Sequence, residues 1–392
     1  MKELRFSYCN EPSDVLDILK PFNADRPATA QVQLHLMPWD NYKQELTAMA
    51  LYSQGADISQ VGGPLVNDLI AMKALRPFTK GEVDSLGGTS AFSQVAWENS
   101  RRKSEGLIYA IPWTIDPRAI IYWRDMLEKA GVDESTAFTS FDQMEDTFRR
   151  LQESGVKSPW LLWMEKLSAL QNACTWIWGA GGEIGNDNQM LILHAKALLG
   201  LRNYFGLFRY MGKNEHQSNL SSDYVAAFTK QRAAVTIGNL SHYHFIKQSV
   251  TPAMQKRLGV AIAPGPLFVG SSSLVVWKGT RDETDAVNLV QYMLSEEAQR
   301  NYCLRVGFLP ARVSLYEEPP FSTEPYLRVF AQAALNGRTI ANFKLGGLLE
   351  DLLANAFSRI WAKIFANPDL DLDAAIRQEL EPIVLRASFW SD

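Results

Sequence analysis

The hydrophobic positions near the start of the chain alternate between the two-residue period of strands and the longer period of amphipathic helices. Strand patterns cover Glu3–Tyr8, Val32–Met37 and Asp57–Val61, and a helix pattern follows each of them. A β-α-β-α-β order of this kind predicts a parallel, doubly wound sheet. We therefore expect an α/β fold class.

The turns that follow these strands carry candidate binding residues, because ligands in open α/β sheets lie at the carboxyl ends of the strands. The six candidates, two after each strand in chain order, are Asn10 and Glu11, Trp39 and Asp40, and Gly62 and Gly63. Glycines let a backbone approach a ligand closely. The alternative is helix capping near Asn10 and a tight turn at the glycines, with no ligand involved.

Residues 109–123 contain two apolar runs of strand character, Tyr109–Ile111 and Ala119–Trp123. Pro112 and Pro117 lie between the runs and are expected to interrupt both strand and helix. We interpret this stretch as a crossing of the chain from one lobe to another. Small-molecule sites concentrate in clefts between lobes.

Three side chains in this crossing suit a polyhydroxylated ligand: the aromatic ring of Trp113, the carboxylate of Asp116 and the guanidinium of Arg118. The alternative is a strand pair joined by a polar loop. In that case Trp113 is an ordinary core aromatic and Asp116 and Arg118 form a surface ion pair.

The second half of the chain contains further strand and helix patterns. A strand at Ala233–Ile237 leads to an expected loop at Gly238–His244, and Pro264-Gly265-Pro266 is a second candidate crossing. The last third of the chain is predicted to be helical. The glycines at 179–182 lack the GxGxxG spacing, which argues against a dinucleotide cofactor.

Composition narrows the class of protein. A chain of 392 residues suggests two or three domains at roughly 150 residues each. The net charge of −4 argues against a nucleic-acid partner. The 11 tryptophans and 13 tyrosines favour stacking or carbohydrate binding about as well as large aromatic cores.

Neither a metal nor a cofactor is expected. The three cysteines form no CxxC pattern, and His242 and His244 have neither an HExxH motif nor clustered carboxylates beside them. No stretch approaches 18 consecutive apolar residues, so no membrane span is expected. The chain opens without a signal-peptide pattern, so it is either cytoplasmic or a mature form without its export signal.

Several collinear stretches resemble the family 1 extracellular solute-binding proteins of ABC importers, the group that includes the maltose- and trehalose-binding proteins. The most telling stretches are Ala56–Val61, Tyr109–Gly131, Trp178–Glu183, Ala233–Gly238, Val260–Pro264, and Ala286–Gln299 followed by Gly307–Arg312. The resemblance covers nearly the whole chain. It implies a periplasmic-binding-protein fold with two α/β lobes and hinge strands between them.

The resemblance implies an N-terminal lobe of residues 1–112 and 265–312 and a C-terminal lobe of residues 113–264 and 313–392, with the ligand cleft between them. Matching positions to the family adds further binding residues to the candidates above, namely Gln171, Trp176, Asn239, Ser241, His242, Ser271 and Ser272. Leu240-Ser241-His242 replaces an aromatic that the family commonly has, and Gly62-Gly63-Pro64 lacks polar side chains. These departures argue against a specific maltose assignment.

The function implied is the solute receptor of an ABC importer for a sugar or another polyhydroxylated small molecule, acting as a monomer with a membrane permease as partner. Its place would be periplasmic or extracellular, with a lipoprotein anchor as one form of attachment. Two alternatives are a sensor domain with the same pocket and a glycoside hydrolase. The hydrolase needs a second carboxylate beside Asp116, and none is apparent.

Overall fold

The computed structural model describes residues 3–39, 41–97, 101–102, 106–186, 189–213, 221–340, 343 and 345–388. The chain divides into two compact units. Unit 1 consists of Met1–Asp116, Gly270–Glu324 and Lys344–Gly347, and unit 2 of Pro117–Val269, Pro325–Phe343 and Leu348–Asp392. In the part of the chain described, no helix has the length and apolarity needed to cross a membrane.

The sheet of unit 1 is built on β1 (Leu4–Tyr8), which pairs in parallel with β2 (Val32–Leu36) and β3 (Ile58–Gly62). The predicted parallel β-α-β-α-β arrangement is thus confirmed. Strand β10 (Val269–Val276) runs antiparallel to β3, with Ser272 opposite Gly62. The start of β10 therefore meets the edge at which the parallel strands end.

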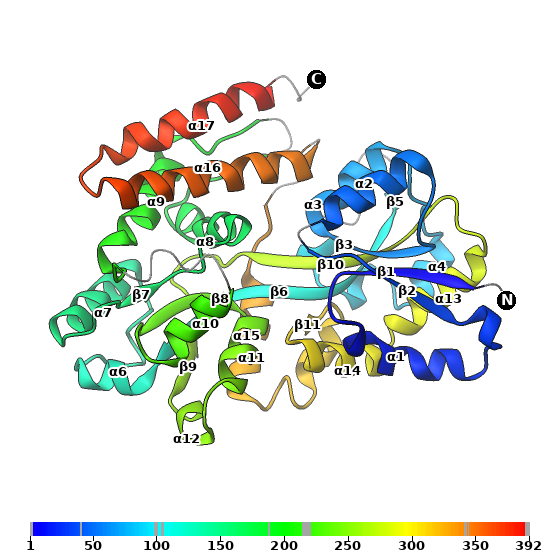
Figure 1. Ribbon diagram of the computed structural model, residues 1–392, viewed down its shortest axis with the longest axis horizontal. Helices are drawn as coiled ribbons and strands as arrows, with labels where there is room; N and C mark the ends of the chain where they lie inside the picture. Colours follow the sequence, from blue (N-terminus) through cyan, green and yellow to red (C-terminus); the bar gives the residue numbers. More distant parts are fainter. Residues whose placement is uncertain are drawn as a thin grey trace. The chain divides into compact units, whose positions relative to one another are not determined.

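Helices cover both faces of this sheet (Figure 1). On one face, α2 (Tyr42–Tyr52) and α3 (Gly63–Ala71) bury apolar side chains against β3 and β10. On the other face, α1 (Pro12–Ala24) packs against α14 (Glu296–Val306). The remaining helices and strands assigned to this unit are α4 (Lys80–Ser85), α5 (Gln94–Trp97), β4 (Arg101–Arg102), β5 (Leu107–Ile108), α13 (Glu283–Met293) and β11 (Leu309–Pro310).

The stretch 110–123 is one strand, β6 (Ala110–Trp123), so the expected interruption at its prolines is wrong. The reason is a change of pairing partner along the strand. Thr114 and Ile115 pair with β11, whereas pairing with β8 (Val235–Asn239) begins at Arg118. Pro117 lies between the two ladders, where no backbone N–H is required of it. The boundary between the two units falls at the same place, after Asp116.

In unit 2, β6 pairs antiparallel with both β8 and β9 (Leu258–Ala261), and β8 pairs in parallel with β7 (Trp160–Leu161). The core joins α8 (Lys166–Gly179), α9 (Ala195–Gly206) and α16 (Gly346–Ala366) through buried apolar residues. The other helices are α6 (Arg124–Lys129), α7 (Phe141–Glu153), α10 (Ser221–Thr229), α11 (Leu240–Gln248), α12 (Pro252–Gln255), α15 (Pro325–Asn336) and α17 (Leu372–Ser388).

The loop expected at 238–244 is wrong as well, because α11 begins directly after β8. Asn239 caps this helix: its Oδ1 accepts from the backbone N–H of His242 at 2.9 Å. The His242 side chain in turn accepts from the Asn239 N–H, which completes a capping box. Glycine followed by several polar residues suggested a loop, whereas the reciprocal cap stabilises a helix.

Candidate functional site

The predicted residues of unit 1 gather at one edge of its sheet. Strands β1, β2 and β3 are parallel, so their carboxyl ends meet at this edge. The residues brought there are Asn10, Glu11, Trp39, Gly62, Gly63, Ser271 and Ser272, while Asp40 lies outside the described residues. Glu11 is exposed and makes no side-chain cap to α1.

Asn10 is held at this edge by two aromatic side chains. Its Oδ1 accepts from Trp39 Nε1 at 2.9 Å, and its Nδ2 donates to the Tyr302 hydroxyl at 3.1 Å. Trp39 keeps 43% of its surface exposed and meets the Tyr42 ring edge-on. An exposed indole whose orientation is set by a hydrogen bond is suited to stacking on an apolar ligand face.

The glycine turn after β3 lies close to the hydroxyl of a tyrosine. A Cβ added at Gly62 would lie 3.1 Å from the hydroxyl oxygen of Tyr42. Gly63 is buried at the first position of α3. The small size of Gly62 therefore brings Tyr42, and through it Trp39, close to this turn.

Ser271 and Ser272 differ in their environments. Ser272 Oγ accepts from Gln60 Nε2 at 3.3 Å, and Gln60 Oε1 accepts from the Cys9 N–H at 3.1 Å. The buried Ser271 Oγ has no partner among the described residues. Gln60, which the sequence did not single out, thus connects the turn after β1 to β10.

Trp113 and Asp116 lie on β6 in different environments. Trp113 is fully buried and stacks on Tyr302, with ring centroids 4.3 Å apart. Its Nε1 is buried without a hydrogen-bond partner. Asp116 is half-buried. The packing of Trp113 matches the core aromatic that the sequence left open as an alternative.

In unit 2, the predicted residues Arg118, Gln171 and Asn239 come together. Arg118 of β6 is opposite Asn239 of β8 in the ladder, and Arg118 Nη2 donates to Gln171 Oε1 of α8. Arg118 is only 3% exposed, and its Nε has no partner. A buried guanidinium therefore lies at the carboxyl end of β8.

The histidine of the capping box at the start of α11 is neutral because it is buried near a positive charge. Burial, and after it the charge of Arg118, lowers the pKa of His242 to about 3. Because His242 Nδ1 accepts from the Asn239 N–H, the ring proton resides on Nε2. Ser241 Oγ donates to Asn239 Oδ1 at 2.9 Å, which further fixes the cap.

Trp163 is a residue that the sequence did not distinguish from its neighbouring tryptophans. It follows β7, is half-buried and meets the His242 ring edge-on at 4.5 Å. Its Nε1 is buried without a partner. Its position just after a short strand parallel to β8 was the available signal. Trp176, which the resemblance suggested, is 3% exposed and packs among Phe141, Trp160 and Tyr204 in the core.

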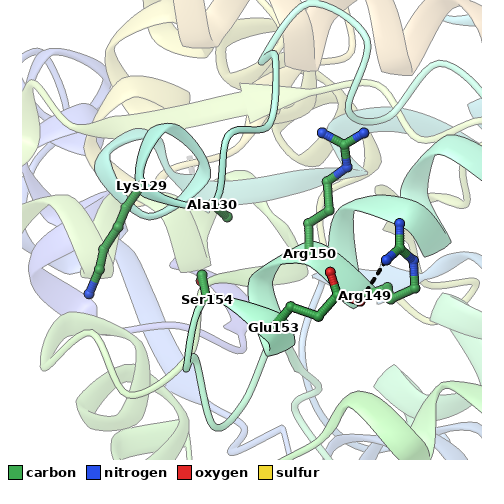
Figure 2. Close-up of a pocket in the computed structure, with 6 residues that line it drawn as sticks. All are labelled: Lys129, Ala130, Arg149, Arg150, Glu153 and Ser154. Carbon is green, nitrogen blue, oxygen red and sulfur yellow. Dashed lines mark hydrogen bonds and ion pairs between the residues drawn. The ribbon is translucent and has the colours of Figure 1, made fainter.

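A surface hollow of about 440 Å³ lies elsewhere, between α6 and α7 (Figure 2). It is lined by Lys129, Arg149, Arg150 and Glu153, and the charges of its two arginines are balanced by nearby carboxylates. Arg149 pairs with Asp146 and Glu153, and Arg150 pairs with Asp146. None of the residues predicted to bind ligand lines this hollow. Among the described residues, no cluster of side chains suited to a metal ion is found.

Comparison with known proteins identifies the class. The chain belongs to the family of bacterial extracellular solute-binding proteins, whose model matches residues 17–329. The solute-binding function expected from the sequence is thereby confirmed at the level of the family.

Individual relatives are distant in sequence. The diacetylchitobiose binding protein DasA of Streptomyces coelicolor is 21% identical over 317 residues, 76% of this chain and 70% of its own length. The sn-glycerol-3-phosphate-binding periplasmic protein UgpB of Salmonella typhimurium is 23% identical over 299 residues, 71% of this chain and 67% of its own. The sugar-binding protein MalE of Xanthomonas citri has a TM-score of 0.83 at 17% identity, covering 99% of this chain and 98% of its own. The predicted fold class, a two-lobe α/β fold of the periplasmic-binding-protein type, is confirmed by this similarity.

Proposed function

We propose that this protein is the solute receptor of an ABC-type importer for a sugar or another polyhydroxylated small molecule. The observation that carries the proposal is the Trp39 indole, exposed at the carboxyl edge of β2 and oriented by its bond to Asn10. A sugar presents flat CH faces and a rim of hydroxyls, which suit an indole beside an amide. Relatives named for binding diacetylchitobiose and glycerol 3-phosphate support this class of ligand.

The two units serve as the two lobes, so that each supplies part of the ligand contacts. Unit 1 offers Trp39, Asn10 and the Ser271 hydroxyl, and unit 2 offers Gln171 and the Trp163 indole. Ligand that contacts both lobes favours the closed state by its differential affinity. Shifting the equilibrium from mostly open to mostly closed takes on the order of 5 kcal/mol. The hinge includes β6, in which the boundary between the units falls.

The closed receptor delivers its solute unchanged to a permease in the membrane. The protein acts as a monomer in the periplasm or outside the cell, with either free diffusion or a lipid anchor. Neither a cofactor nor a metal takes part. A hydrolase requires two carboxylates at a set separation. The side chains that carry this proposal are amides, hydroxyls and indoles, and the carboxylates among the described candidates, Glu11 and Asp116, are assigned to ligand binding.

A screen of the full chain against mono-, di- and oligosaccharides and polyols tests the proposal. Thermal shift detects binding because a one-site ligand stabilises in proportion to the logarithm of saturation. We expect at least one polyhydroxylated solute to bind with 1:1 stoichiometry by calorimetry and to be recovered intact by mass spectrometry. Release of hydrolysis products, or no binding by any polyhydroxylated solute, would contradict the proposal.

A further inference from the structure

Arg118 is a buried cation for which the described residues supply no ion-pair partner. The residue is 3% exposed, and the acceptor that its guanidinium reaches among the described residues is the neutral Gln171 Oε1. Its Nε is buried with no hydrogen-bond partner among the described residues, and the ion pairs found among those residues do not include Arg118. Burying an ionised group is strongly unfavourable unless it is paired.

Arg26, the other buried arginine among the described residues, has a fully paired charge. Arg26 in unit 1 is 8% exposed, and its two terminal nitrogens bond both oxygens of Asp285 at 2.9 and 2.7 Å. Its Nε donates to the Ala30 carbonyl at 2.6 Å. Arg118 lacks such a carboxylate, which sets it apart from an arginine that only stabilises the fold.

The positive charge of Arg118 affects the pKa values of neighbouring side chains. Burial lowers the pKa of His242 and raises that of Tyr224, and in both cases Arg118 is the charged group that contributes. Glu350 of α16 is a buried carboxylate of the same unit. Its charge adds to the burial that raises the pKa of the Cys174 thiol, whereas the charge of Arg118 acts on that thiol in the opposite direction.

Donor groups gather at this place. Trp163 Nε1 and Arg118 Nε are both buried N–H donors that have no partner in the described part of the chain. His242 carries its ring proton on Nε2, because Nδ1 accepts from Asn239. The Trp163 and His242 rings are in contact, and Arg118 is opposite Asn239 in the ladder. The surroundings of Arg118 therefore combine a positive charge with unused hydrogen-bond donors. A ligand rich in hydrogen-bond acceptors would complement them.

We propose that the solute of this receptor carries an anionic group, a carboxylate or a phosphate, which pairs with the guanidinium of Arg118. The inference rests on the proposed receptor function and specifies its class of ligand as an acidic sugar or an acidic polyol. The planar fork of a guanidinium matches either anion with two parallel hydrogen bonds. Gln171, which accepts from Arg118, and Ser241, which donates to the Asn239 cap opposite it, are half-buried rather than fully buried.

Matched pairs of neutral and acidic probes test the proposal on the full chain. The pairs are glycerol with sn-glycerol 3-phosphate, glucose with glucose 6-phosphate, and glucose with glucuronate, each titrated by calorimetry and thermal shift. We expect at least one acidic member to bind 100-fold or more tightly than its neutral partner. The phosphate and carboxylate arms distinguish the two anions.

The variants are R118M, R118K and, as a control, R149M, which removes an exposed arginine of α7. R118M should abolish the preference for the acidic probe, R118K should keep part of it, and R149M should bind as wild type. If R118M does not fold, the wild-type pairs and R118K decide the question.

Three results would overturn the inference. Neutral members that bind as tightly as their acidic partners would overturn it while leaving the proposed receptor function standing, as would R118M with wild-type affinity for an acidic probe. No binding by any member, together with an empty sugar and polyol screen, would overturn both.

Discussion

The indole Nε1 of Trp39 donates to the side-chain oxygen of Asn10 at 2.9 Å, which joins the turn after β2 to the turn after β1. The bond orients the one large exposed aromatic found at this edge among the described residues. Because Asn10 also donates to Tyr302, its amide cannot rotate without losing both partners. The edge is therefore organised before any ligand arrives, which lowers the entropic cost of binding.

We expect Trp39→Ala to weaken the best ligand of the screen at least tenfold, about 1.4 kcal/mol, because the stacking surface is lost. The free energy of unfolding should change by less than about 1 kcal/mol, since the side chain is half exposed. Calorimetry and urea unfolding measure the two effects. Tyr52→Ala removes a 71% exposed aromatic from α2 and serves as the control. Equal affinities for the Trp39 and Tyr52 variants would remove Trp39 from the site.

Asp116→Ala should weaken the best ligand tenfold or more without unfolding the protein. A half-buried carboxylate that accepts hydroxyl hydrogen bonds contributes about 1.5–3 kcal/mol through charge-assisted bonds. Calorimetry gives the affinity, and circular dichroism reports the fold. Asp142→Ala, at an exposed position in the first turn of α7, is the matched control. Unchanged affinity would show that Asp116 makes no contact with ligand.

Trp113→Ala should lower the free energy of unfolding by about 3–5 kcal/mol, as large-to-small changes at fully buried aromatics do. The ring is packed among Phe6, Tyr8 and Tyr302, so its removal leaves a cavity. Urea unfolding measures the loss, and Trp113→Phe should recover a large part of it. A stable Trp113→Ala variant that no longer binds ligand would instead assign the ring to the binding surface.

His242 predicts a pH dependence of stability. Its pKa is about 3 in the folded chain against an ordinary value of 6.5 for histidine, so the unfolded chain binds more protons between these values. The contribution of neutral His242 to the free energy of unfolding is fully present above pH 6.5 and is lost as the pH falls towards 3. The free energy of unfolding then changes by up to about 1.4 kcal/mol per pH unit.

Unfolding by urea between pH 4 and 8 measures this slope. His242→Gln should flatten it, because glutamine keeps the capping box but does not titrate. His194→Gln, at an exposed position, should leave it unchanged. An identical slope in wild type and His242→Gln would contradict the prediction.

Much of unit 1 was predictable because its elements depend on local patterns. Alternation located β1, β2 and β3, and glycine and proline marked the turns after them. The single strand β6 was not predictable, since the tolerance of Pro117 depends on which strands pair on either side of it. The helix at Leu240–Gln248 was missed because a side-chain cap outweighed the weak helix propensity of its residues.

The location of the candidate binding residues was predictable from the sequence, but their exposure was not. Their place at strand ends follows from the order of elements, because parallel strands bring their carboxyl ends to one edge. Whether an aromatic there is exposed depends on packing, so Trp39 and Trp163 could not be separated from Trp113 and Trp176 in advance.

By itself, the sequence determined the α/β class, the strands of the first sheet and the short stretches in which binding residues would lie, because these depend on the period of hydrophobic positions and on turn chemistry. Only the tertiary structure decided that Trp39 keeps an exposed face, that Trp113 is packed on Tyr302 and that Arg118 is buried without a carboxylate. Exposure and charge pairing depend on segments far apart in the chain, such as β6 with α8, and no local pattern encodes which of them come into contact.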